Sequence, residues 1–112
     1  MGKPDYFKEA PIAVTICDKE GIILEMNDKS VKTFIKDGKS LIGASLLDCH
    51  PEPARRKLTA MLENHNVNAY TISKNGIKKL IYQMPWFVEG EFAGYIELSM
   101  EIPEEMPHFV RG

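Results

Sequence analysis

The spacing of hydrophobic residues divides the chain into a first pair of strands, a helical middle and three later strands. Residues 12–17 and 22–26 are short apolar runs separated by a turn that ends in Gly21. This pattern predicts a β-hairpin. Residues 67–73, 77–88 and 92–100 are further strand-like runs, and an Asn-Gly pair typical of tight turns joins the first two. The order predicts a five-stranded antiparallel sheet.

The middle of the chain has the spacing of helices. Asn27 or Asp28 can cap a helix whose apolar face carries Val31, Phe34 and Ile35. A short helical turn over residues 45–48 is expected to direct Leu46 and Leu47 inward. A longer amphipathic helix follows, with one face formed by Ala54, Leu58, Met61 and Leu62. Because every helix falls in one connection, we expect them all on one face of the sheet, in an α+β domain.

Alternation along the last strands suggests which sheet face the helices cover. Glu97 and Ser99 are polar and are expected to face water, so the even-numbered positions of this strand should be buried. The even positions of the preceding strand are all large: Leu80, Tyr82, Met84 and Trp86. Pro85 cannot donate to a ladder, which predicts an edge or a bulge there.

The length of 112 residues and a hydrophobic content of 44% are those of one globular domain. We expect an N-terminal helical cap over residues 1–10, a domain over residues 11–102 and a tail over residues 103–112. A chain this small is expected to pass any signal to a partner, or to be a fragment of a longer protein.

Charge and composition exclude several classes of function. The net charge of −2 gives no basic face for nucleic acid. No apolar run is long enough to cross a membrane, and no signal core precedes the domain, so a cytoplasmic location is expected. Cys17 and Cys49 are expected to be reduced thiols, with a disulfide between them as the alternative. The three histidines lack metal-ligand spacing. No catalytic constellation is visible, so the sequence predicts that the protein is not an enzyme.

The order of elements and several short motifs resemble the PAS domain, over about residues 11–102. The hairpin carries Asp18, Gly21, Ile22 and Asn27, and the closing strand carries Gly94-Tyr95-Ile96. Between them lie Ile42-Gly43 and Leu46-Leu47-Asp48. The resemblance implies a PAS-like five-stranded antiparallel sheet with helices on one face. It also implies a sensor or interaction module with a cavity between helices and sheet, and no catalysis.

The Cys49-His50-Pro51 element is similar to a bacterial and archaeal PAS subgroup. The Gly-Arg-Asn-Cys pattern that anchors flavin in light-sensing members is absent, so flavin is not expected. The arginine common on the first strand of the meander is also absent.

Candidate ligand-binding residues are those expected to line the space between helices and sheet. They are Asn27, Phe34, Leu46, Leu47, His50, Leu58, Leu62, Tyr70, Tyr82, Met84, Trp86 and Ile96. His50 is a candidate haem ligand, since a neutral imidazole binds haem iron. It could equally cap a helix or bond a backbone carbonyl. Asn27 could bind a ligand or only cap the helix, and the large strand residues could simply fill the core.

Three functions stay open from the sequence. The first is a signal-transduction sensor that binds a small molecule in the cavity and acts through protein contacts. The second is a haem sensor with His50 as the iron ligand. The third is a ligand-free module that forms a homodimer or docks on a signalling partner.

Overall fold

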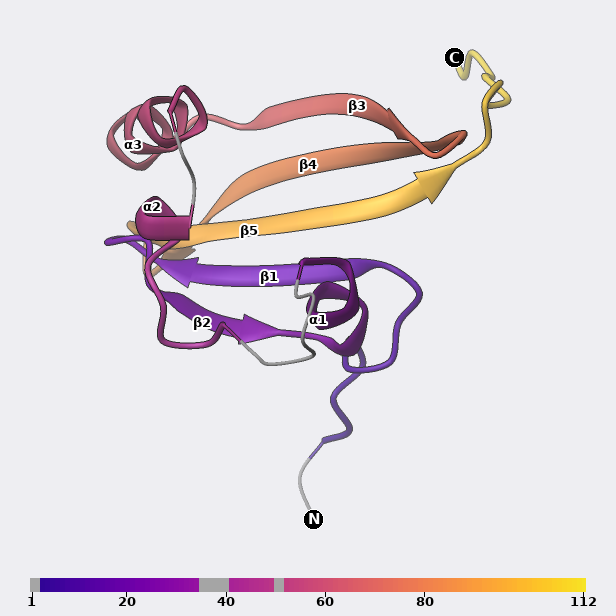
Figure 1. Ribbon diagram of the computed structural model, residues 1–112. Coiled ribbons are helices and arrows are strands. Elements are labelled where there is room, and N and C mark those ends of the chain that lie inside the picture. Colours follow the sequence, from indigo (N-terminus) through magenta and orange to yellow (C-terminus); the bar gives the residue numbers. More distant parts are fainter. Residues whose placement is uncertain (1–2, 35–40, 50–51) are drawn as a thin grey trace.

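The computed structural model describes residues 3–34, 41–49 and 52–112, and Figure 1 shows an antiparallel sheet with the helices gathered on one side. The strand order is β2-β1-β5-β4-β3, and every neighbouring pair is antiparallel. The elements, in chain order, are β1 (Ala13–Asp18), β2 (Ile23–Met26), α1 (Asp28–Phe34), α2 (Leu46–Cys49), α3 (Ala54–Asn64), β3 (Asn68–Lys74), β4 (Ile77–Val88) and β5 (Glu91–Ile102). The predicted α+β architecture is confirmed.

Asn27 closes the first hairpin and starts α1. Its side-chain oxygen accepts hydrogen bonds from the backbone N–H groups of Val14 at 2.9 Å and Ser30 at 3.0 Å. Its amide nitrogen donates to the carbonyl oxygens of Phe7 at 2.7 Å and Ile12 at 2.8 Å. The buried amide is thus satisfied on both sides, so it caps the helix and holds the N-terminal segment against the sheet.

The N-terminal segment, where a helical cap is expected, contains a turn in its described part. Residues 6–9 form a hydrogen-bonded turn, in which the N–H of Ala10 donates to the carbonyl oxygen of Phe7 at 3.2 Å. The N–H of Phe7 donates to the Asp5 side chain. Pro11 disfavours the helical conformation at Ala10, so the turn is not extended into a longer helix within residues 3–10.

The three-strand meander follows the predicted turns. Asn75 and Gly76 have φ angles of 53° and 79°, as a tight hairpin with two left-handed residues requires. β3 pairs with β4 only as far as Gln83. Pro85 therefore has β5 as a neighbour on one side and no pairing with β3 on the other. A bulge follows between Trp86 and Phe87. The expected edge or bulge at Pro85 is confirmed.

The two faces of the sheet are the reverse of the prediction. Tyr95 contacts α3 through its hydroxyl, and Glu97 lies two residues along the same strand face. Ser99 and Ile81 pair across β5 and β4 on this face, and each is 5% exposed. Up to the bulge, over residues 77–86 of β4 and 94–102 of β5, the odd-numbered residues therefore face the helices.

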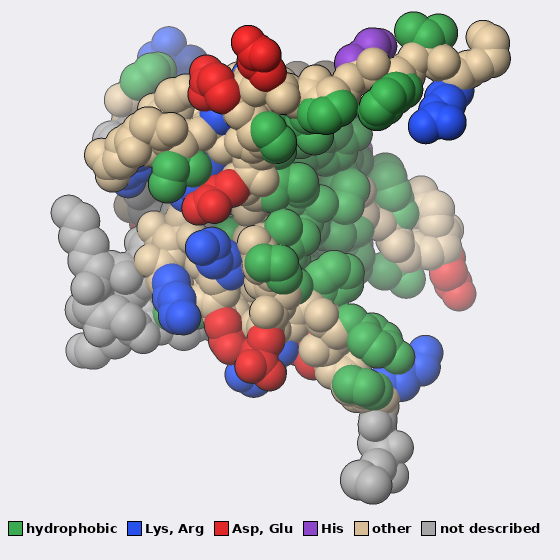
Figure 2. Space-filling model, turned by 90° about the vertical axis from the view of Figure 1, so that its right-hand side faces the viewer, with side chains coloured by type: hydrophobic (Ala, Val, Ile, Leu, Met, Phe, Trp, Pro, Cys, Tyr) green, Lys and Arg blue, Asp and Glu red, His purple; other side chains and the backbone are tan. Residues whose placement is uncertain are grey.

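The even-numbered residues form the opposite side, which we call the outer face. It comprises Ile16, Leu80, Tyr82, Met84, Trp86, Ile96, Leu98 and Met100. These side chains are half-buried against one another. Figure 2 shows hydrophobic side chains gathered in a continuous band bordered by charged groups.

Gly94 lets Trp86 lie flat across β5 on the outer face. The Trp86 indole N–H donates to the carbonyl oxygen of Cys17 in β1 at 3.0 Å. A Cβ on Gly94 would overlap that oxygen and lie 2.7 Å from the indole nitrogen. Only glycine permits this close approach.

Candidate functional site

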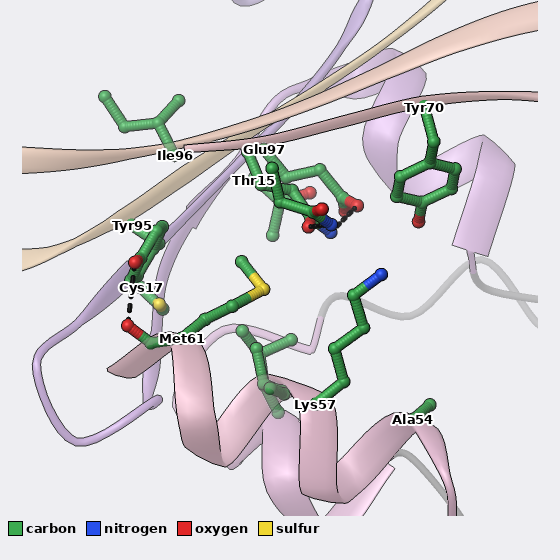
Figure 3. Close-up of a pocket in the computed structure, with 13 residues that line it drawn as sticks. Thr15, Cys17, Ala54, Lys57, Met61, Tyr70, Tyr95, Ile96 and Glu97 are labelled. Atoms are coloured by element: carbon green, nitrogen blue, oxygen red, sulfur yellow. Dashed lines mark hydrogen bonds between the residues drawn. The ribbon is translucent and has the colours of Figure 1, made fainter. Parts of the chain in front are cut away.

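A half-open cavity of about 140 Å³ lies between α3 and the sheet, as shown in Figure 3. Strand residues Thr15, Cys17, Asn68, Tyr70, Gln83, Tyr95, Ile96 and Glu97 form one wall. Helix residues Leu46, Ala54, Lys57, Leu58 and Met61 form the other. A cavity of about 150 Å³ holds one benzene molecule, so this space suits a molecule of similar size.

One end of the cavity is apolar. Cys17, Met61 and Tyr95 form a buried cluster, and Leu46 packs against it. The Leu58 side chain adds a further apolar contact from α3. This end offers mainly dispersion contacts, since the Tyr95 hydroxyl is already hydrogen-bonded to the carbonyl oxygens of Met61 and Asn66.

The other end is a directed hydrogen-bond chain. The Asn68 amide donates to the Gln83 side-chain oxygen at 2.8 Å, and the Gln83 amide nitrogen donates to Glu97 Oε1 at 2.9 Å. An ionised carboxylate can only accept, so Glu97 fixes the orientation of both amides. The chain therefore ends in a negative charge on the cavity wall.

Lys57 and Tyr70 stand at the mouth. The Lys57 ammonium lies 5.4 Å from the centre of the Tyr70 ring, within the range of a cation–π contact. Burial raises the pKa of the Tyr70 hydroxyl, and the negative charge of Glu97 raises it further. Tyr70 therefore stays a neutral hydrogen-bonding group at neutral pH.

Cys17 is 2% exposed and borders the apolar end. Burial is the main reason that the pKa of its thiol is raised, and the charges of Asp18 and Glu97 act in the same direction. The thiol is thus protonated at neutral pH and is a poor nucleophile.

Tyr95 ties the end of α3 to the sheet. Its hydroxyl donates to the Met61 carbonyl oxygen at 2.7 Å, and the Asn66 carbonyl oxygen lies 2.9 Å away. The ring is 4% exposed and packs edge-on against Phe92. Because Met61 and Tyr95 both line the cavity, this bond sets the separation of its walls.

The structure brings four of the predicted site residues to the cavity: Leu46, Leu58, Tyr70 and Ile96. Ile96 only borders it, since its side chain points away from α3 in Figure 3. Whether these residues bind a ligand stays a prediction.

The other predicted residues lie elsewhere. Asn27 is a cap with all its bonds made within the protein, and Leu62 packs behind the buried cluster. Leu47 lies near Gly21 and is not part of the cavity wall. His50 and the side chain of Phe34 lie outside the described residues.

Tyr82, Met84 and Trp86 are placed on the outer face, and the prediction that they line the cavity is wrong. The reason is that the polar residues Glu97 and Gln83, which alternation assigns to water, bond each other beneath α3. Ile81 and Tyr95, whose odd-numbered positions the alternation would assign to the exposed face, are 5% and 4% exposed on the helix side of the sheet.

Sequence reasoning missed the polar lining residues Thr15, Lys57, Asn68, Gln83 and Glu97. One signal was present. Gln83 and Glu97 fall opposite each other if the hairpin is counted back from the turn at Glu89-Gly90 with one bulge, and paired polar residues in a central position suggest mutual hydrogen bonds.

No described group of His, Cys, Asp or Glu is arranged to hold a metal ion. None of the described helices is both long and apolar enough to cross a bilayer.

Comparison with known proteins gives structural matches only. No family model and no curated protein matches the sequence. The PAS domain of BvgS from Bordetella pertussis superposes with a TM-score of 0.65 and 21% identity, covering 88% of this chain and 82% of that one. A sensory box sensor histidine kinase from Vibrio cholerae gives 0.63 and 17%, covering 86% and 85%.

The Aer2 receptor from Vibrio cholerae, described as a dual PAS-haem oxygen sensor, gives a TM-score of 0.61 and 18% identity. The match covers 82% of this chain and 95% of that one. At these identities the likeness concerns the fold, and the fold of this chain is that of PAS domains.

Proposed function

We propose that this chain is a sensory domain that binds a small molecule between α3 and the sheet and signals through protein contacts on the outer face. The observation that carries the proposal is the cavity itself, with an apolar end and a separate polar end. A small apolar pocket with a few oriented polar groups is the usual form of a ligand site. The absence of a catalytic constellation in the sequence favours sensing over catalysis.

The same strands supply both the cavity wall and the outer face, which gives a route for the signal. Gln83 and Glu97 face the cavity, whereas their neighbours Tyr82, Met84 and Leu98 face outward. A ligand that replaces or weakens the hydrogen bond between Gln83 and Glu97 would shift β4 and β5 relative to each other. That shift would change the shape of the outer face, where a partner would sense it.

A cavity-filling variant tests ligand binding. Leu58→Trp should fill the space, whereas Thr59→Trp adds the same ring on the exposed side of the same helix. Protein from native cells should release a small molecule that mass spectrometry detects, and Leu58→Trp should release none while Thr59→Trp matches the wild type. Equal release from all three proteins, or none from any, would contradict ligand binding in this cavity.

The outer face favours a second function, a homodimer that forms with or without a ligand. Its apolar side chains come from adjacent central strands and form one surface. A continuous apolar patch on a folded domain marks an interaction site. A second copy of the chain is a natural occupant, because the apolar side chains of one copy would pack on the same side chains of the other.

Light scattering tests the dimer. Met84→Glu places a charge in the middle of the outer face, and Ile72→Glu places one on a half-exposed residue of the opposite face. The wild type and Ile72→Glu should have the mass of a dimer, and Met84→Glu that of a monomer. A monomeric wild type at high concentration would refute this function.

Haem does not fit the described cavity as it stands. A space for one small ring cannot hold a porphyrin, and no histidine is among the described residues that line it. The haem proposal with His50 as ligand would require α3 to move away from the sheet. An absorption spectrum with added haem, on wild type and His50→Ala, tests it, because a Soret band lost in the variant is the required result.

A further inference from the structure

The charges that face the cavity define the chemistry of its ligand. Glu97 Oε1 accepts from Gln83, and no described residue donates to its second carboxylate oxygen. A partly buried carboxylate with one hydrogen bond is poorly neutralised. It therefore offers a site for a positively charged donor.

Lys57 supplies the opposite charge from the other wall. Its ammonium points over the Tyr70 ring toward the cavity, as Figure 3 shows. Within the described ranges the ion pairs are Lys8–Asp28, Arg55–Asp48 and Arg56–Glu52, so neither Lys57 nor Glu97 takes part in one. A positive and a negative group thus face each other across the space without touching.

We infer that the cavity selects a small zwitterion, with an ammonium group for Glu97, a carboxylate for Lys57 and a short apolar group for the Met61 end. This inference rests on the proposed ligand-binding function. A simple amine would satisfy Glu97 but meet the charge of Lys57, and a simple carboxylate would meet the charge of Glu97. Only a ligand with both signs gains at both walls, because each charge-assisted hydrogen bond forms without a like charge left opposite.

The size of the cavity restricts the class further. A volume of about 140 Å³ admits a ring or a branched chain of a few carbons beside the two charged groups. Cys17, Leu46 and Met61 surround that apolar group. An aliphatic α-amino acid with a short side chain has this combination.

Three probes that differ in one group each test the inference by titration calorimetry at neutral pH. They are L-valine, isobutylamine, which lacks the carboxylate, and isovalerate, which lacks the ammonium. L-Valine should bind about tenfold to a hundredfold more tightly than either analogue, since each lost charge-assisted bond costs about that much. Equal binding of all three, or tighter binding of an analogue, would overturn the inference.

Two variants should exchange the preference. Glu97→Gln keeps an oxygen that can accept from Gln83. It should lower the affinity for L-valine by about tenfold and raise the affinity for isovalerate. Lys57→Met should lower the affinity for L-valine by a similar factor and raise the affinity for isobutylamine. Lys32→Met, an exposed lysine of α1, should change nothing. If either cavity variant weakens all three probes equally, the charges do not select the ligand.

Failure of this inference differs from failure of the proposed function. If native protein releases a molecule without both charges, or binds the analogues as well as L-valine, the cavity binds ligands and only the zwitterion is wrong. If no probe binds and native protein releases nothing, the ligand-binding function itself is wrong, because Lys57 and Glu97 then face only solvent.

Discussion

The two faces of the sheet differ in a way opposite to the usual rule. The face beneath the helices carries Thr15, Gln83 and Glu97, whereas the face without a helix carries Tyr82, Met84 and Leu98. In an antiparallel sheet that has helices on one side, the more apolar face is expected to pack on the helices and the more polar face to meet water. Here the covered face is the more polar of the two.

The composition of each face is explained if the covered face binds a small ligand and the outer face binds another protein. Polar groups under α3 are tolerated because they bond one another and border a cavity. Apolar groups on the outer face are consistent with a surface that another protein covers. The comparison therefore separates ligand recognition on one side of β4 and β5 from protein recognition on the other.

The largest expected effect is at Gly94, where β5 lies against β1 and Trp86 with no room for a side chain. Gly94→Ala should lower the free energy of unfolding by about 3 kcal/mol or more, because its Cβ would overlap the Cys17 carbonyl oxygen. Urea unfolding followed by circular dichroism measures this change. A loss under about 1 kcal/mol would show that β1 and β5 adjust freely.

Trp86→Phe provides the control for Gly94→Ala. It removes only the indole bond to Cys17 and should cost about 1 kcal/mol. The double variant should stay as unstable as Gly94→Ala, because the main overlap is with backbone and not with the indole ring. Recovery of stability in the double variant would assign the strain to Trp86 instead.

A smaller effect is expected on the helix side, at Tyr95. Tyr95→Phe removes the bond to the Met61 carbonyl oxygen while keeping the ring, and should cost about 1–2 kcal/mol. Hydrogen exchange should rise most at the C-terminal end of α3, since that end loses its tie to the sheet. Uniform exchange across the chain would contradict a local role.

The sequence predicted the elements well because turns and caps are local. Asn27, the Asn75-Gly76 pair and the interruption at Pro85 each act on their own neighbours, and their positions agree with the structure. The helix residues Leu46 and Leu58, predicted to line the space, do line the cavity. That prediction needed only the inference that all helices pack on one face of the sheet. Local chemistry and chain order were sufficient for that much.

The choice of sheet face could not be made in the same way. It depends on the long-range bonds from Gln83 to Glu97 and from Tyr95 to α3, which no local pattern contains. Alternation identified the two sets of residues but assigned the polar set to water. A polar-lined cavity breaks the assumption that polar means exposed, and so Tyr82, Met84 and Trp86 were placed on the wrong side.

The smallest expected effect is a loss of stability at alkaline pH that originates on the helix side. Burial is the main cause of the raised pKa values of Cys17, Tyr70 and Tyr95. The folded protein therefore keeps these protons to higher pH than the unfolded chain does. The contribution is fully present below the ordinary thiol pKa, about 8.5, and is lost as pH rises through the folded values.

Urea midpoints measured from neutral to alkaline pH test this dependence, with Cys17→Ala as the matched variant. Cys17→Ala should be less stable at neutral pH, because it leaves a small void, yet its midpoint should fall less steeply between about pH 8.5 and 10. The rest of the slope in that variant belongs to the two tyrosines. Parallel slopes for the two proteins would mean that the Cys17 thiol ionises as easily in the folded chain as in the unfolded one, and the apolar end of the cavity would then have to admit water.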